Sequence, residues 1–283
     1  MALRDRAAEA PPAPKPRGKA KRLAKVQSRS PRRYAITYDV NGPHIRLGFL
    51  WFLLVAGAMV IGKEAVAALY ALTAALAGYQ GARTWQPLGR RADPYLAAAI
   101  GGGIGLSALA GPSAVGVAVL AAVGASLVAS MTSEEARQAP LVAVGYTLQC
   151  GLFAGLAAAA PTLAYRVDLG AAAALIVFVS VYEMGDYIVG SGSKNSVEGP
   201  LAGITAIAVF AFAAWVITFV PFQENSLLAF GALAAGLCPA GQLLASATLP
   251  RSDARAPAVR RLDSLYLLGP VWVVAIWSYL EII

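Results

Sequence analysis

The stretch PYLAAAIGGGIGLSALAGPSAVGVAVLAAVGASLVASM, Pro94–Met131, contains no charged side chain. A helix needs about 20 residues to cross a hydrocarbon core of about 30 Å, so this stretch predicts two membrane spans, at about 94–110 and 113–131. Backbone polar groups in lipid must be satisfied within the segment, which favours helices over strands. The many glycine and alanine residues would allow neighbouring helices to approach closely.

Apolar segments of similar length lie on both sides of this stretch. They are found at about 46–62, 64–81, 140–161, 168–190, 200–220, 227–248 and 264–281. The composition agrees with this pattern, because 58% of the residues are hydrophobic and only 13% are charged, against about 25% charged in an ordinary soluble domain. We therefore expect an all-α, polytopic transmembrane protein with about nine spans.

The basic residues are concentrated near the N-terminus. The chain has 23 Lys and Arg residues against 15 Asp and Glu residues, a formal net charge of +8, and much of this excess lies in residues 1–33. Because that segment lacks an apolar periodicity, we expect residues 1–40 to form a disordered basic cytoplasmic arm. Two roles stay open for the arm: it fixes the topology, or it binds anionic membrane lipids. The rest of the chain is nearly neutral, so no nucleic-acid partner is expected.

The loops between the spans predict the orientation. Most of their Lys and Arg residues fall on the same side as the basic arm, which is typical of cytoplasmic loops. We expect a multi-pass protein of the cell (plasma) membrane, in which the polar loops around 183–199 and 249–263 face the cytoplasm. Residues 41–165 would form an N-terminal set of transmembrane helices, and residues 166–283 a C-terminal set that contains the polar motifs.

Carboxylates are the best candidates for chemistry in this chain. The only histidine is His44, and Cys150 and Cys238 lie in apolar runs without the neighbours of a zinc or redox motif. Ionisable residues at membrane depth are usually functional. Glu183 and Asp186, three residues apart at the end of the sixth span, share one helix face. Such a pair either holds a divalent cation or forms a solvated helix end.

Four short motifs follow in a recognisable order. They are EMGDYIVG (Glu183–Gly190), KNSVEG (Lys194–Gly199), GQLLASATLPR (Gly241–Arg251) and RRLDSL (Arg260–Leu265). In this order, and with about nine spans, the chain resembles the integral-membrane phosphatidate cytidylyltransferases, or CDP-diacylglycerol synthases. The motifs cover about residues 170–282, and the remainder is similar to the family by hydropathy alone.

The resemblance implies a reaction and a set of site residues. CTP and phosphatidate, or a related lipid phosphate, would give a CDP-lipid and pyrophosphate in phospholipid biosynthesis, with Mg²⁺ bringing the two anions together. The implied catalytic residues and magnesium ligands are Glu183, Asp186 and Asp263. The implied substrate-binding residues are Lys194, Ser196, Glu198, Arg251 and Arg261. The motifs leave a homodimer open.

Several positions depart from the family pattern. Glu183, Gln242 and Arg260 stand where the family has aspartates, Pro250 stands where it has a lysine, and the family's H-G-G element is absent. Two hypotheses therefore remain: a divergent cytidylyltransferase, or a catalytically inactive homologue that acts as a membrane lipid-binding or regulatory partner. A small-solute transporter is less favoured, because the chain lacks the internal repeat of that class.

Overall fold

Each of the nine apolar segments coincides with a helix. The computed structural model describes residue 36 and residues 44–132, 139–193, 195–217, 219–223 and 225–280, without the side chains of residues 44–46. The arm predicted for residues 1–40 lies outside the described residues, apart from residue 36. Within the described part, the regular elements are all helices, and no strand is present.

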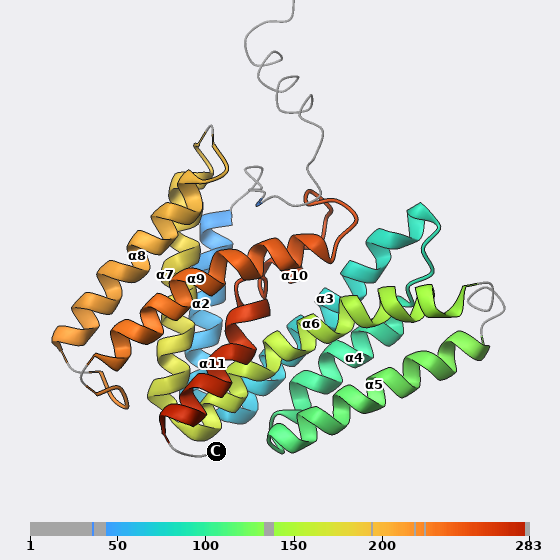
Figure 1. The fold of residues 1–283 in the computed structure, drawn as a ribbon, viewed down its shortest axis with the longest axis horizontal. Helices are drawn as coiled ribbons and strands as arrows, with labels where there is room; N and C mark the ends of the chain where they lie inside the picture. Colours follow the sequence, from blue (N-terminus) through green and yellow to red (C-terminus); the bar gives the residue numbers. More distant parts are fainter. Residues whose placement is uncertain are drawn as a thin grey trace, which may run out of the picture. The chain divides into compact units, whose positions relative to one another are not determined.

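The helices follow one another with short connections (Figure 1). They are α2 (His44–Ile61), α3 (Lys63–Trp85), η1 (Gln86–Leu88), α4 (Pro94–Ser107), α5 (Pro112–Thr132), α6 (Pro140–Val167), α7 (Leu169–Gly190), α8 (Glu198–Val216), α9 (Ser226–Ala247), α10 (Pro257–Arg260) and α11 (Leu265–Tyr279).

Six helices in the described part of the chain are long and apolar enough to cross a membrane: α3 continued by η1, α5, α6, α7, α8 and α9. The prediction of an all-α, multi-pass membrane protein is confirmed to this extent. The helices α2 and α11 have shorter apolar stretches. With 14 residues, α4 is about 21 Å long at 1.5 Å per residue, which is less than the hydrocarbon core. Nine crossings remain a prediction.

Local sequence explains where two of the helices begin. At α4, Pro94 occupies the first turn, and Oδ1 of Asp93 accepts hydrogen bonds from the backbone N–H groups of Tyr95 and Leu96, at 2.9 and 3.1 Å. At α7, Asp168 caps the helix in the same way. Such caps satisfy N–H groups that have no partner within the helix.

The helices pack as two groups, which are joined by α11 and by the contact between α6 and α7 (Figure 1). In the first group α3 packs on α4 and α6, and α5 packs on α4 and α6. In the second group α7 packs on α8, and α8 packs on α9. The helix α11 contacts both α6 and α9, so it holds the motif-bearing helices against the rest of the bundle.

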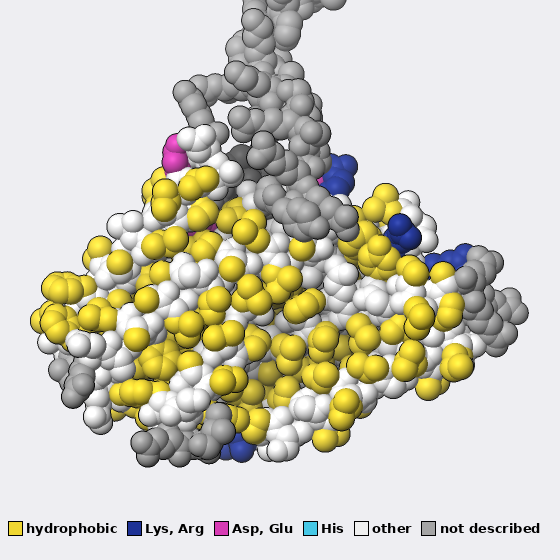
Figure 2. All heavy atoms as spheres, in the orientation of Figure 1, with side chains coloured by type: hydrophobic (Ala, Val, Ile, Leu, Met, Phe, Trp, Pro, Cys, Tyr) yellow, Lys and Arg dark blue, Asp and Glu magenta, His cyan; other side chains and the backbone are white. Residues whose placement is uncertain are grey.

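Hydrophobic side chains form most of the surface on the face shown in Figure 2. They cover a wide band, and the described Lys, Arg, Asp and Glu side chains lie near its margins. Many exposed apolar residues belong to α5 and α8, including Val117, Leu120, Val209 and Phe212. An apolar belt with charged margins is typical of a protein surrounded by lipid.

Candidate functional site

A glycine on α9 brings this helix against the turn between α10 and α11. A Cβ atom at Gly241 would lie 2.6 Å from the backbone oxygen of Asp263 and 3.0 Å from that of Ser264. Only glycine leaves room for two backbones at this distance. The contact places the next residue, Gln242, beside the carboxylates that the motifs predicted as a site.

Asp186, Gln242 and Tyr182 form a buried hydrogen-bond chain between α7 and α9. Nε2 of Gln242 donates to Oδ2 of Asp186 at 3.1 Å, and the hydroxyl of Tyr182 donates to Oε1 of Gln242 at 3.0 Å. All three residues are buried, with Asp186 3% exposed. Both ends of the Gln242 amide are therefore used, and the amide stabilises a carboxylate away from solvent.

Asp263 has protein partners of its own. Its Oδ1 accepts a hydrogen bond of 2.8 Å from the backbone N–H of Ser264, and its Oδ2 lies 3.6 Å from Nη1 of Arg260. Burial raises the pKa of Asp263 to about 6, against the opposing effect of the Arg260 guanidinium. Arg260 also donates to Oγ of Ser246 and to the backbone oxygen of Ser252, at 3.0 and 2.6 Å. These bonds fix the guanidinium beside the carboxylate.

Glu183 differs from the other two carboxylates. Its Oε1 atom is buried and has no hydrogen-bond partner among the described residues. Glu183 lines a small cavity of about 20 Å³ together with Arg261 and Tyr70. The positive charge of Arg261 attracts the Glu183 carboxylate, and the negative charge of Asp263 repels it. A cavity of this size holds about one water molecule, so it is far too small for a nucleotide.

Three of the five predicted substrate-binding residues are exposed. Ser196 and Glu198 are exposed at the start of α8, where Oε1 of Glu198 accepts a hydrogen bond from Asn195. Arg251 is exposed and binds both carboxylate oxygens of Asp253, at 2.9 and 2.7 Å. Lys194 lies outside the described residues. Among the predicted phosphate contacts that the structure describes, Arg261 lies beside the carboxylate of Glu183.

Two of the three predicted metal ligands have protein groups as direct partners. Within the described ranges, no group of three or more His, Cys, Asp and Glu side chains is arranged to hold a metal ion. Instead, Asp186 and Asp263 face an amide and a guanidinium of the protein. The residues present therefore do not fit Mg²⁺ bound by Glu183, Asp186 and Asp263, since that ion requires several oxygen ligands in near-octahedral geometry.

Two residues have contacts that the motifs did not predict. Gln242 and Arg260 were recognised only as departures from a pattern, yet they are the direct partners of Asp186 and Asp263. Their chemistry was a usable signal, because an amide N–H donor and a cation both satisfy a buried carboxylate.

Comparison with known proteins adds no family: the chain matches no protein-family model and no curated protein.

Proposed function

We propose that this chain is a multi-pass membrane protein with the helical frame of a cytidylyltransferase-like site but without its catalytic metal, and that it acts as a lipid-binding or regulatory partner. One observation carries the proposal. The side chains at positions 242 and 260 supply a donor to Asp186 and a positive charge to Asp263, at the two positions where the resembling family has carboxylates.

These two side chains change the charge of the site. Relative to aspartate, Gln242 removes one negative charge and Arg260 replaces a negative charge with a positive one. Both changes make the electrostatic potential around Asp186 and Asp263 less negative, which disfavours a divalent cation. The remaining carboxylates do not require a cation, because protein groups already neutralise or solvate them.

Without a metal, two anionic substrates would not be brought together. CTP and phosphatidate repel each other, and phosphoryl transfer depends on cations that offset the charge developing in the transition state. Arg251 is bound to Asp253, and Arg261 lies beside Glu183. Neither guanidinium is held in position for two phosphate groups, which disfavours nucleotide transfer at this site.

We infer that the protein lies in the cell membrane, with its motif loops and its N-terminus in the cytoplasm. Two contacts support one common side for the basic loops. Nε1 of Trp85, at the end of α3, donates to the backbone oxygen of Thr248, and Oε1 of Gln80 accepts from the backbone N–H of Ala258. The arginines that follow α3 and those of the α9–α11 connection therefore lie at the same end of the bundle, as the positive-inside rule expects.

A second candidate function, cytidylyl transfer, is favoured by Glu183. A buried carboxylate oxygen without a hydrogen-bond partner is the kind of atom that a cation would satisfy. In that case Glu183 and Asp263, with Arg260 displaced from Asp263, would hold Mg²⁺, which would offset the negative charge of the phosphates as the lipid phosphate replaces pyrophosphate on the α-phosphate of CTP.

A turnover assay separates the two candidates. The full chain is placed in lipid nanodiscs that contain phosphatidate, and the formation of CDP-lipid from labelled CTP is measured with and without Mg²⁺. We expect no CDP-lipid above a protein-free control. Magnesium-dependent turnover that Glu183→Gln and Asp263→Asn both abolish, while Arg83→Ala on the exposed surface of α3 retains it, would instead establish the transferase.

A further inference from the structure

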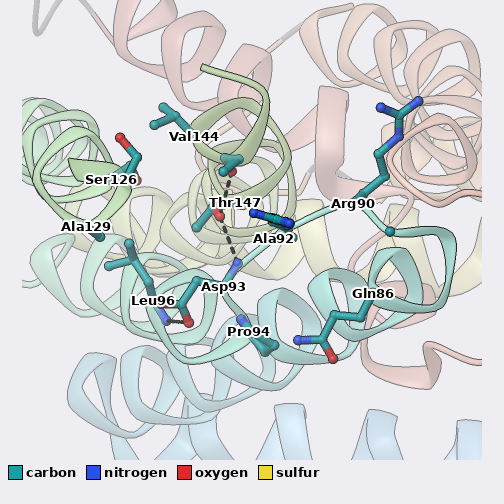
Figure 3. Close-up of a pocket in the computed structure, with 14 residues that line it drawn as sticks. Gln86, Arg90, Ala92, Asp93, Pro94, Leu96, Ser126, Ala129, Val144 and Thr147 are labelled. Atoms are coloured by element: carbon teal, nitrogen blue, oxygen red, sulfur yellow. Dashed lines mark hydrogen bonds between the residues drawn. The ribbon is translucent and has the colours of Figure 1, made fainter. Parts of the chain in front are cut away.

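A second cavity, of about 530 Å³, lies between the connection that follows η1, the start of α4, the second half of α5 and the start of α6 (Figure 3). It is far larger than the cavity at Glu183 and shares no lining residue with it. The volume falls in the range of small-ligand pockets, about 300–1,000 Å³. None of the four motifs contributes to its walls.

Three polar side chains in the walls, those of Asp93, Thr147 and Ser130, already have hydrogen-bond partners. Oδ1 of Asp93 accepts the two N–H groups that begin α4. The hydroxyl of Thr147 accepts a hydrogen bond from the backbone N–H of Asp93, which Figure 3 draws as a dashed line. The same hydroxyl donates to the backbone oxygen of Ala143. The hydroxyl of Ser130 donates to the backbone oxygen of Leu127. These bonds make the wall rigid.

Ser126 differs from these three hydrogen-bonded residues. It is 2% exposed and lines the cavity from α5, and its hydroxyl has no hydrogen-bond partner among the described residues. A buried hydroxyl without a partner costs free energy in the folded protein. A polar atom of a ligand in the cavity would remove that cost.

The charged groups of the cavity favour an anion. Arg90 and Arg91 line it together with one carboxylate, that of Asp93, so the basic groups exceed the acidic group by one. The guanidinium of Arg90 also lies 5.6 Å from the centre of the Tyr146 ring, a contact that restrains it. Arginine binds phosphate oxygens through two parallel N–H groups.

One wall of the cavity continues into the lipid-facing surface. The helix α5 is the least buried of the six candidate spans, because only 22% of its 18-residue apolar stretch is buried inside the protein. Beside Ser126, the side chains of Leu127 and Val128 are 42% and 62% exposed. A ligand with a phosphate in the cavity can therefore extend apolar chains along α5.

We propose that this cavity binds the head group of an anionic membrane phospholipid. Arg90 and Arg91 bind the phosphate, the hydroxyl of Ser126 donates to an oxygen of the head group or of the glycerol esters, and the acyl chains lie along α5. This site is separate from the carboxylate network, and it does not depend on whether that network transfers a nucleotide.

The test uses the full chain in detergent and titrates it with phosphatidylglycerol, phosphatidylcholine or inorganic phosphate. Bound lipid is counted by native mass spectrometry. We expect phosphatidylglycerol to bind at least tenfold more tightly than phosphatidylcholine, and inorganic phosphate at the same concentration not to compete. Arg90→Ala and Ser126→Ala should each weaken phosphatidylglycerol binding at least threefold.

Arg83→Ala is the matched control, because Arg83 is a nearby arginine on α3 that donates to Tyr79 and does not line the cavity. Ser126→Ala removes a single oxygen, so it keeps the test decisive if Arg90→Ala fails to fold. Equal binding of phosphatidylglycerol by the wild type and Ser126→Ala would overturn the proposal. Equal binding of the two lipids would reduce the site to unspecific lipid contact, and competition by inorganic phosphate would make it a free-phosphate site.

Discussion

The side-chain amide of Gln242 donates a hydrogen bond of 3.1 Å to Asp186, across the contact between α9 and α7. Under the proposed relation to the cytidylyltransferases, this position would have a second carboxylate, and two neighbouring carboxylates repel each other unless a cation lies between them. On that proposal, the amide takes the place of the cation. The relationship between these two residues is the main reason to regard the site as structural.

Replacing Gln242 with leucine should destabilise the protein strongly. Gln242→Leu leaves Asp186 buried without this donor, which we expect to cost about 2–3 kcal/mol of unfolding free energy, as for other hydrogen bonds to charged groups. Tyr182→Phe is the control, because it removes only the neutral end of the chain and should cost about 1 kcal/mol. Chemical denaturation in detergent measures both, and equal effects would contradict the assignment of the charged bond.

Two glycines on α9 should respond differently to alanine. Gly241→Ala places a Cβ atom 2.6 Å from the backbone oxygen of Asp263, so it should lose about 2 kcal/mol through overpacking. A Cβ atom at Gly236 meets nothing within 4 Å, so Gly236→Ala should be neutral or slightly stabilising, since alanine favours a helix. Thermal unfolding distinguishes them, and similar melting temperatures would show that α9 does not contact the turn before α11 in this way.

Asp263 should make stability depend on pH. Its pKa in the folded protein is raised from 3.8 to about 6 by burial, so between pH 4 and pH 6 the unfolded state releases this proton first. The unfolding free energy therefore falls as the pH rises through that interval, and Asp263→Asn should flatten this part of the curve.

Asp253 provides the control for this pH dependence. Its bond to Arg251 lowers its pKa, so its contribution grows until the unfolded state is also deprotonated, at about pH 5, and Asp253→Asn should leave the slope between about pH 5 and pH 6 unchanged. Melting temperatures recorded across this interval test both variants. A slope that Asp263→Asn does not alter would rule out a raised pKa at this position.

Single cysteines should report the predicted orientation. Cys150 and Cys238 are buried, so an exposed cysteine introduced at Ser196 or Ala110 is the accessible thiol. Ser196→Cys, after α7, should react with a membrane-impermeant maleimide only from the cytoplasm. Ala110→Cys, between α4 and α5, should react only from the opposite side, and labelling of both from one side would overturn the topology.

The sequence was sufficient to predict the helices but not the lengths of all of them. Long apolar runs predict helices because lipid leaves the backbone no other partner, and each predicted span has its helix. The helix α4 was expected at 94–110 but ends at Ser107. Residues 108–110 form a turn before Gly111, where φ is +111°, and an apolar run does not predict where such a turn occurs.

The site was predictable as a set of segments and not as a set of contacts. The motif order indicated that the ends of α7 and α9 and the turn before α11 belong together, and the hydrogen bonds of Gln242 and the close approach at Gly241 join these segments. The bond between Arg251 and Asp253, by contrast, depends on the local path of a loop. The cavity beside Ser126 combines three separate stretches of the chain, and Ser126 lies in an apolar run that by sequence predicts only a lipid-facing helix.

A metal-binding titration tests the central claim most directly. The full chain in phosphatidylcholine nanodiscs is titrated with Mn²⁺, which prefers the same oxygen ligands as Mg²⁺, and the bound ion is followed by electron paramagnetic resonance. We predict no saturable site in the wild type, and one new site per chain in the Gln242→Asp, Arg260→Asp double variant. One saturable Mn²⁺ per wild-type chain, lost in both Glu183→Gln and Asp263→Asn, would contradict the account.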